Sequence, residues 1–155
     1  MHLPRKPVAF ALAAFAALFA GCATSSQSGG SLKGVSRVYV AETIGATTPE
    51  TTGATNAVHD AAVRELGARG YVVVPAAAQA DAVLRSSWRI RQSETNNSNI
   101  PVVSLSVSLF DKSGHRLFDA DSGSSVPTSF WNESRAAQEA SVMLGRLTKA
   151  SVQQK

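Results

Sequence analysis

The chain has 155 residues, a formal net charge of +4 and one cysteine. This length suits one domain with short extensions, and a single cysteine excludes an internal disulfide framework. Two of the 15 basic residues lie at the amino end. The remainder therefore has 13 basic against 11 acidic residues, and nothing in it calls for a nucleic-acid partner.

The first 21 residues predict a secretory signal peptide. A basic start with Arg5 and Lys6 precedes an apolar run over residues 8–20, which ends shortly before Cys22. This run is too short for a transmembrane helix, because 13 helical residues at ~1.5 Å each span roughly 20 Å, whereas the hydrocarbon core of a membrane is ~30 Å thick. A buried core helix is disfavoured as well, since Gly/Ser-rich sequence follows at once.

The segment Leu-Phe-Ala-Gly-Cys, which ends at Cys22, resembles the lipobox of bacterial lipoproteins, where cleavage falls just before the cysteine. That family usually has leucine three residues before the cysteine, whereas here Phe19 has that place and Leu18 precedes it. The resemblance implies a diacylglyceryl group on the thiol of Cys22 and an acylated amino group, because two or more acyl chains are needed for stable anchoring. An ordinary signal peptide with an incidental cysteine, or a free buried thiol, are the alternatives.

The residues after the cysteine bear on location. In these lipoproteins an aspartate there favours the inner membrane, and this chain has Ala23 and Thr24. The resemblance thus implies the outer membrane, facing the periplasm, with the inner membrane as the alternative. Residues 22–34 are rich in Ser and Gly and predict a flexible tether with a reach of ~20 Å. A single domain is predicted over residues 35–152.

The first part of this domain predicts a strand, a helix and a strand. Residues 35–41 alternate apolar and polar side chains as a strand does, and residues 42–53, rich in Thr and Gly, predict a loop. Residues 54–69 have an apolar stripe at helical spacing and are followed by Gly70, a preferred residue at a helix C-terminus. Residues 71–74 then predict the returning strand of a β-α-β unit.

Three strands and a helix follow. Residues 82–92 and 102–111 alternate apolar and polar side chains, residues 112–115 predict a hairpin turn, and residues 116–122 predict a weaker strand near an edge. The second helix is predicted over residues 133–150. Its expected N-cap is Asn132, its hydrophobic staple is Trp131 with Ala136, and its last turns carry Arg146 and Lys149.

The resulting order, β-α-β-β-β-β-α, predicts an α/β (α+β) two-layer sandwich with one mixed sheet and both helices on one face. Residues 66–84 (LGARGYVVVPAAAQADAVL) and the Asp-x-x-Gly-x-x-Leu pattern from Asp111 resemble small periplasmic lipoprotein domains, such as the amino-terminal domain of TolB and the curli secretion lipoprotein CsgG. The resemblance implies a fold and a compartment. Such domains are mostly binding or assembly modules, so it assigns no catalytic residue.

Two groups of residues are candidates for binding. The polar face of the strand over residues 82–92 offers a platform for an anionic partner, and the alternative is a solvated face paired across strands with Asp111, Asp119 or Asp121. Its arginines are Arg85, Arg89 and Arg91. Trp88 of the same strand lies among apolar residues and predicts a core anchor. Phe130 and Trp131 predict either an exposed partner-binding pair or, for Trp131, the staple.

Catalytic and metal-binding motifs are weak. Residues 119–123 resemble a calcium loop but lack its third acid, and Phe130 stands where the closing glutamate would be, so no metal is predicted. His59 and His115 lack a His-Glu-x-x-His spacing, and no Gly-x-Ser-x-Gly, phosphate-binding loop or Ser-x-x-Lys occurs. No cofactor is expected beyond the lipid. A Ser/His/Asp catalytic site that the fold assembles from distant residues remains an alternative.

We therefore expect a non-enzymatic, membrane-anchored periplasmic lipoprotein that binds envelope proteins or assists their assembly. The alternative is a structural or glycan-binding module that contacts peptidoglycan through Arg85, Arg89 and Arg91. A periplasmic hydrolase is the third hypothesis.

Overall fold

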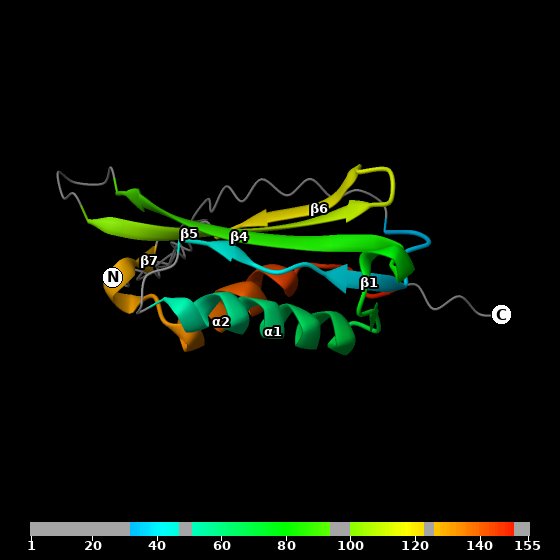
Figure 1. Ribbon diagram of the computed structural model, residues 1–155, viewed down its shortest axis with the longest axis horizontal. Coiled ribbons are helices and arrows are strands. Elements are labelled where there is room, and N and C mark those ends of the chain that lie inside the picture. Colours follow the sequence, from blue (N-terminus) through cyan, green and yellow to red (C-terminus); the bar gives the residue numbers. More distant parts are fainter. Residues whose placement is uncertain (1–31, 47–50, 94–99, 123–125, 151–155) are drawn as a thin grey trace, which may run out of the picture.

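The computed structural model describes residues 32–46, 51–93, 100–122 and 126–150, which form one twisted sheet with two helices (Figure 1). The predicted signal peptide, Cys22 and most of the predicted tether lie outside these residues. The strands are β1 (Arg37–Val40), β2 (Ile44–Gly45), β3 (Val72–Val73), β4 (Ala82–Gln92), β5 (Pro101–Asp111), β6 (Arg116–Asp121) and β7 (Val126–Pro127). The helices are α1 (Thr52–Ala68) and α2 (Glu133–Leu144), with short 3-10 turns η1 (Ala77–Gln79) and η2 (Thr128–Phe130).

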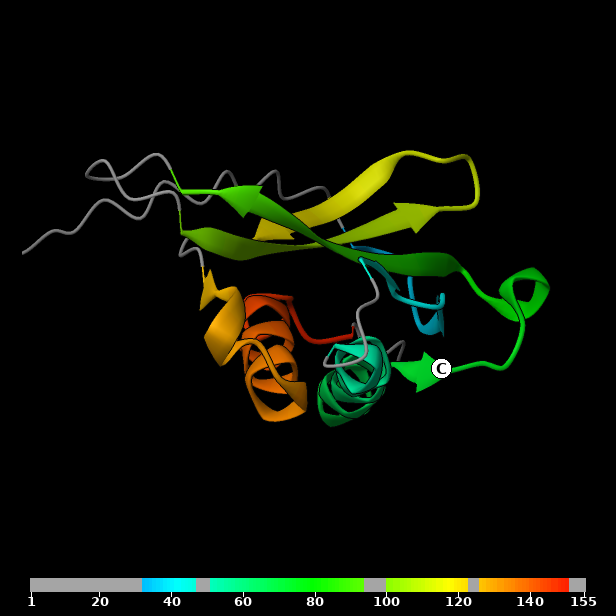
Figure 2. The same cartoon turned by 60° about the vertical axis from the view of Figure 1, so that its left-hand side comes forward.

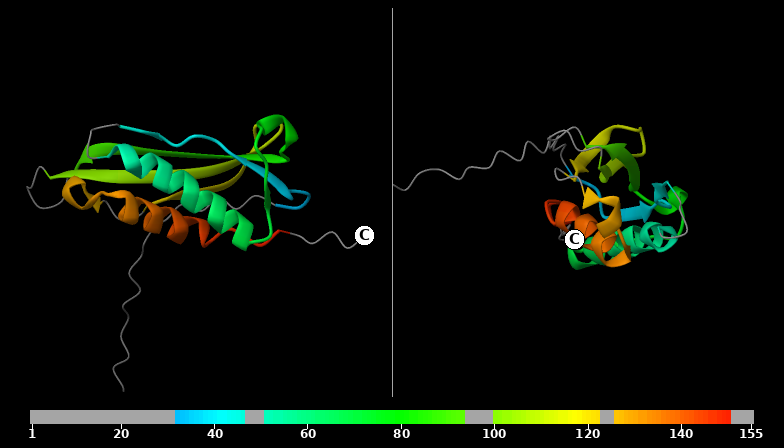
Figure 3. Two further views of the ribbon diagram at one scale, coloured as in Figure 1. Left: turned by 60° about the horizontal axis from the view of Figure 1, so that its bottom comes forward. Right: turned by 90° about the vertical axis from the view of Figure 1, so that its left-hand side faces the viewer.

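The sheet is mixed. Its main path runs β3-β1-β4-β5-β6, with β2 beside β4 and β7 beside β5. β1 is parallel to β3 and to β4, whereas β4, β5 and β6 are antiparallel neighbours. Both helices lie on the same side of the sheet (Figure 2) and run side by side along it (Figure 3). The predicted mixed α/β class, with one mixed sheet and two helices, is confirmed.

The alternation of side chains gives the sheet one buried and one open face. On the helix side of β4, Leu84 and Trp88 are 0% and 3% exposed, and Leu105 and Leu109 of β5 are fully buried. The intervening residues of β4, such as Arg85, are exposed. This is the pattern expected of antiparallel strands covered on one side only. The helices bury the apolar half of the sequence pattern and leave the polar half to solvent.

The start of β4 is fastened to the start of β1 by Asp81. One of its carboxylate oxygens accepts hydrogen bonds from the backbone N–H groups of Ser36 (3.2 Å) and Arg37 (2.9 Å), and the other accepts from the Arg37 guanidinium (2.9 Å). The Asp81 N–H in turn donates to the Arg37 carbonyl (2.8 Å). The Arg37 side chain and these backbone donors hold the pKa of the Asp81 carboxyl well below its usual range. The contacts fix the register that pairs Val38 with Ala82.

Helix α2 begins as the sequence predicts. The Asn132 side chain accepts a hydrogen bond from the Arg135 backbone N–H at 2.9 Å, which makes Asn132 the N-cap. Trp131 is buried in the same core cluster as Ala136, and its ring lies 5.7 Å from that of Trp88 in β4. The first turn of α2 is thereby attached to the sheet by aromatic packing.

The end of α2 was predicted too late. The helix stops at Leu144 rather than at Ala150, so the predicted position of Arg146 and Lys149 in its last turns is wrong. The prediction ran too far because Leu147 continues the apolar spacing of the helix. Leu147 is buried, although it lies outside the helix. Its carbonyl accepts a hydrogen bond from the Arg69 guanidinium (2.8 Å), and hydrogen bonds to the end of α1 therefore replace further helical turns.

Other boundaries also differ from the prediction. Two short strands, β2 and β7, lie within segments predicted as loops, because two-residue strands carry no period. Gly45 of β2 lies so close to the Trp88 indole that a Cβ there would collide with it. Helix α1 begins at Thr52 instead of Ala54. Leu32, expected in the tether, packs partly against the core, since a turn through Gly34 (φ +82°) folds it back.

The Asp81 contacts generate a prediction about pH. We expect Asp81→Asn to lower the free energy of unfolding at neutral pH, and to flatten its fall in acid. A folded-state pKa depressed below the unfolded value of ~3.9 gives stability that is present above that value and lost as the pH falls towards the folded pKa. Urea unfolding curves at neutral pH and near pH ~3 measure this. Asp60→Asn, on the exposed side of α1, is the matched control, and equal acid sensitivity of both variants would contradict the role of Asp81.

Candidate binding surface on the open face of the sheet

The open face is formed by the outward residues of β4, β5 and β6. Strand pairing arranges them in rows across the sheet. Arg85 of β4 stands opposite Ser108 of β5, and the next row pairs Ser87 with Ser106. On β6, these serines stand opposite Asp119 and Asp121, respectively. We call this surface, with Arg89 and Ser104 of the following row, the open face. It brings together polar residues that lie far apart in the sequence.

The carboxylates of the open face are held in place by their neighbours. The Ser106 hydroxyl donates to Asp121 and the Ser108 hydroxyl donates to Asp119. The Arg116 guanidinium adds a contact of 3.0 Å to the second oxygen of Asp119. Because both carboxylates are only partly exposed, these bonds orient them without a ligand.

In the part of the chain that the structure describes, Arg85 and Arg89 do not make the cross-strand pairs that were the alternative prediction. Arg85 lies over the Phe110 ring, with 5.3 Å from the guanidinium carbon to the ring centroid. Among the described residues, neither Arg85 nor Arg89 is ion-paired with a carboxylate. The reason is geometric, because β5 lies between β4 and the aspartates of β6. Arg91 is exposed as well.

Asp111 was the remaining predicted partner of the β4 arginines, but its carboxylate accepts hydrogen bonds from its own turn instead. One of its oxygens accepts from the backbone N–H groups of Ser113 and His115, both at 2.8 Å, and the other lies 3.2 Å from the His115 ring. These donors, His115 first, lower the pKa of the Asp111 carboxyl. Gly114 in this turn has φ +82°, which a glycine adopts without strain. The predicted hairpin turn is confirmed.

A groove of about 620 Å³ lies on the open face. It is lined from three strands by Arg89, by Ser104 and Ser106, and by Asp121, and apolar Ile44 and Ile90 border it. Such a mixture of fixed polar groups and apolar edges can bind a polar ligand or a partner surface. Sequence reasoning found the arginines here but missed the serine–aspartate pairs. Their only signal is the alternating serines of β5 with the Asp-Ala-Asp of β6.

The two aromatic residues before α2 have different environments. Phe130 is 67% exposed, whereas Trp131 is 4% exposed and packs on Trp88. The prediction that both residues form an exposed pair is therefore wrong for Trp131, because its indole is buried in the core. Only Phe130 of the pair is exposed. Trp88 is 3% exposed, which confirms it as a core anchor.

The two histidines within the described residues are on separate elements. His59 of α1 lies 3.4 Å from the neighbouring Asp60, and His115 precedes β6. Within the described residues, no group of three or more His, Cys, Asp or Glu side chains could hold a metal ion. The calcium-like segment 119–123 is instead strand as far as Asp121. No helix in the described part of the chain has the length and apolar character needed to cross a membrane.

Comparisons with known proteins show the fold. The PelC dodecamer from Paraburkholderia phytofirmans, in two crystal forms, matches with a TM-score of 0.56 and 22% sequence identity, over 82% of this chain and 99% of that chain. A PDZ domain protein from Parabacteroides distasonis matches with a TM-score of 0.52 and 10% identity, over 75% of this chain and 33% of that protein. No protein-family model and no curated protein sequence matches the chain.

The environments of the two aromatic residues predict unequal effects on stability. Trp131→Ala should lower the free energy of unfolding by about 3–5 kcal/mol, because it leaves a cavity beside Trp88. Phe130→Ala should change it by under ~0.5 kcal/mol, since most of that ring is in solvent. Chemical unfolding followed by tryptophan fluorescence and circular dichroism compares the two variants, and similar losses would contradict the assignment.

Proposed function

We propose that this protein is a lipid-anchored lipoprotein of the bacterial envelope, facing the periplasm, and that its domain is a non-enzymatic binding or assembly module. The observation that carries the binding role is the open face. Its hydroxyls and carboxylates are held by one another, and the helices leave this side of the sheet uncovered (Figure 2). A surface with fixed polar groups loses little conformational entropy on binding.

The anchor part of the proposal rests on the sequence around Cys22. The part of the chain that the structure describes begins at Leu32, so about ten residues separate it from the proposed lipid on Cys22. A Gly/Ser-rich segment of that length has a typical reach of ~20 Å. The domain would then work close to the membrane surface, where its partners are other envelope components.

Self-association is one form that assembly takes in this proposal. PelC from Paraburkholderia phytofirmans, which shares the fold over 82% of this chain, is described as a dodecamer. We therefore include a second copy of this chain among the partners of the open face.

A glycan is the second candidate ligand, and the groove favours it. Serine hydroxyls line one polar cleft of about 620 Å³ together with Arg89, which has no carboxylate partner among the described residues, and such a cleft suits hydroxyl-rich ligands such as peptidoglycan strands. Pull-down on peptidoglycan by the purified chain that is lost in an Arg89→Gln variant would favour this candidate over a protein partner.

The anchor predicts a change in cell fractionation. Cys22→Ser removes the thiol that would carry the lipid, so we expect the protein to move from the membrane fraction to the soluble periplasmic fraction. Mass spectrometry of the mature amino terminus measures the lipid directly. Ala23→Ser is the matched control and should remain in the membrane fraction. An unmodified Cys22, or cleavage elsewhere, would overturn the anchor.

The binding role is tested by crosslinking in the envelope. A photo-crosslinking amino acid placed at Ser104 should capture a partner, whereas one placed at Val142, which is 55% exposed on α2, should not. The mass of the product distinguishes a second copy of this chain from another envelope protein. Equal capture from both positions would contradict the open face as the contact surface. A hydrolytic turnover that one point mutation abolishes would contradict the non-enzymatic role.

A further inference from the structure

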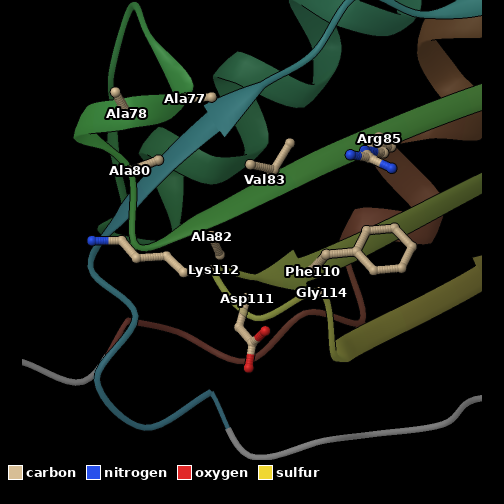
Figure 4. Close-up of a pocket in the computed structure, with 10 residues that line it drawn as sticks. All are labelled: Ala77, Ala78, Ala80, Ala82, Val83, Arg85, Phe110, Asp111, Lys112 and Gly114. Carbon is tan, nitrogen blue, oxygen red and sulfur yellow. The ribbon is translucent and has the colours of Figure 1, made fainter.

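A second cavity, of about 490 Å³, lies where β4 begins and where the turn between β5 and β6 approaches it (Figure 4). It shares no lining residue with the groove on the open face. Its volume lies within the ~300–1,000 Å³ that small-ligand sites occupy. The residues that decide its chemistry are Ala77, Ala78, Val83, Arg85, Phe110 and Lys112.

The apolar part of the cavity is made of small side chains. Ala77 and Ala78 of η1 are both exposed and form one wall. Val83 of β4 and Phe110 of β5 are cross-strand partners and form the surface beside them. Methyl groups on one side and a partly buried ring on the other suit a ligand with a small apolar body.

The charged part of the cavity contains two cations, Arg85 and Lys112, and one carboxylate, Asp111. Arg85 is held over the Phe110 ring at 5.3 Å, and Lys112 of the turn lines the cavity with its amine directed away from Arg85 (Figure 4). Among the described residues, neither cation is ion-paired with a carboxylate. Asp111 also lines the cavity, but its oxygens already accept hydrogen bonds from Ser113 and His115.

We propose that this cavity binds the free carboxyl terminus of a partner protein that ends in small apolar residues. The planar guanidinium of Arg85 offers two parallel N–H groups to the terminal carboxylate, and stacking on Phe110 holds it ready for that pairing. Lys112 adds charge from its flexible stem. The terminal side chains contact Ala77 and Val83, which a bare inorganic anion cannot do.

The test is a titration of the mature chain carrying Cys22→Ser, followed by amide chemical shifts in NMR spectra. The probe is N-acetyl-L-alanyl-L-alanine. We expect saturable shifts centred on Ala77, Ala78 and Gly114. The terminal amide of the same dipeptide should bind at least about tenfold more weakly, because it lacks the charge that Arg85 pairs with. No saturable shift at millimolar dipeptide, or equal binding of acid and amide, would overturn the proposal.

Three variants locate the interaction. Arg85→Gln and Lys112→Gln should each weaken binding of the dipeptide, by about tenfold or more for Arg85. Lys112 is an exposed turn residue, so its variant keeps the test valid if the loss of Arg85 disturbs Phe110. Arg89→Gln, on the same strand face but outside this cavity, should bind as the parent chain does. Equal weakening by Arg89→Gln would overturn the site.

Two further probes decide the ligand class. Inorganic phosphate should bind more weakly than the dipeptide, and N-acetyl-D-alanyl-D-alanine should bind more weakly than the L,L form. Equal binding of phosphate would overturn the apolar part of the proposal. Preference for the D,D form would overturn the protein terminus in favour of a cell-wall peptide. Arg85 belongs to the open face as well, but the dipeptide titration involves neither the lipid anchor nor the groove lined by Arg89, so failure here is distinguishable from failure of the proposed function.

Discussion

The contacts of Asp81 with the start of β1 set the register on which both faces of the sheet depend. Successive side chains of a strand point to opposite faces, so a slip of one residue would exchange the two sets. Leu84 and Trp88 would then meet solvent, and Arg85 and Arg89 would meet the helices. A carboxylate is well suited to prevent this, because it accepts several hydrogen bonds at once, here from the backbone of two successive residues and from the Arg37 guanidinium. The register is thus fixed by the residue that directly precedes β4, next to Ala82, where the long ladder with β5 begins.

The two helices cover the apolar face of the sheet that this register defines. The parallel strands β1 and β3 require cover, because parallel sheet seldom stands in water. α1 provides it as the crossover between them, and α2 covers β5 beside it. Two contacts keep the helices in place at opposite ends. Trp131 packs on Trp88 where α2 starts, and past its end Tyr71 donates a hydrogen bond to the Thr148 carbonyl at 2.8 Å. Burial of the Tyr71 side chain raises the pKa of its hydroxyl.

The sequence predicted the long elements well because their periods are long enough to be distinctive. β4 was placed with its observed bounds, and the N-cap at Asn132 followed from residue type alone. The errors arose where tertiary contacts decide. β2 and β7 exist only because β4 and β5 offer partners, and α2 ends where Arg69 bonds the Leu147 carbonyl. The open face was half predicted, since the arginines lie on one strand. Its serine–aspartate pairs join residues that are 15 and 11 positions apart in the sequence, and no local pattern specifies such a pairing.

The distribution of charge on the uncovered side of the sheet narrows the kind of partner it can take. The carboxylates of β6 are satisfied by serines and by Arg116, so a cationic partner would have to displace existing bonds to reach them. Arg85 and Arg89 form no ion pair with a carboxylate of the described residues, and their charge is available to a ligand. The aspartates therefore hold neighbouring strands together, and the arginines are the groups that can attract an anionic ligand. A partner that presents carboxylates or polar hydroxyls to β4 gains these contacts without breaking the pairs that hold β5 and β6 together.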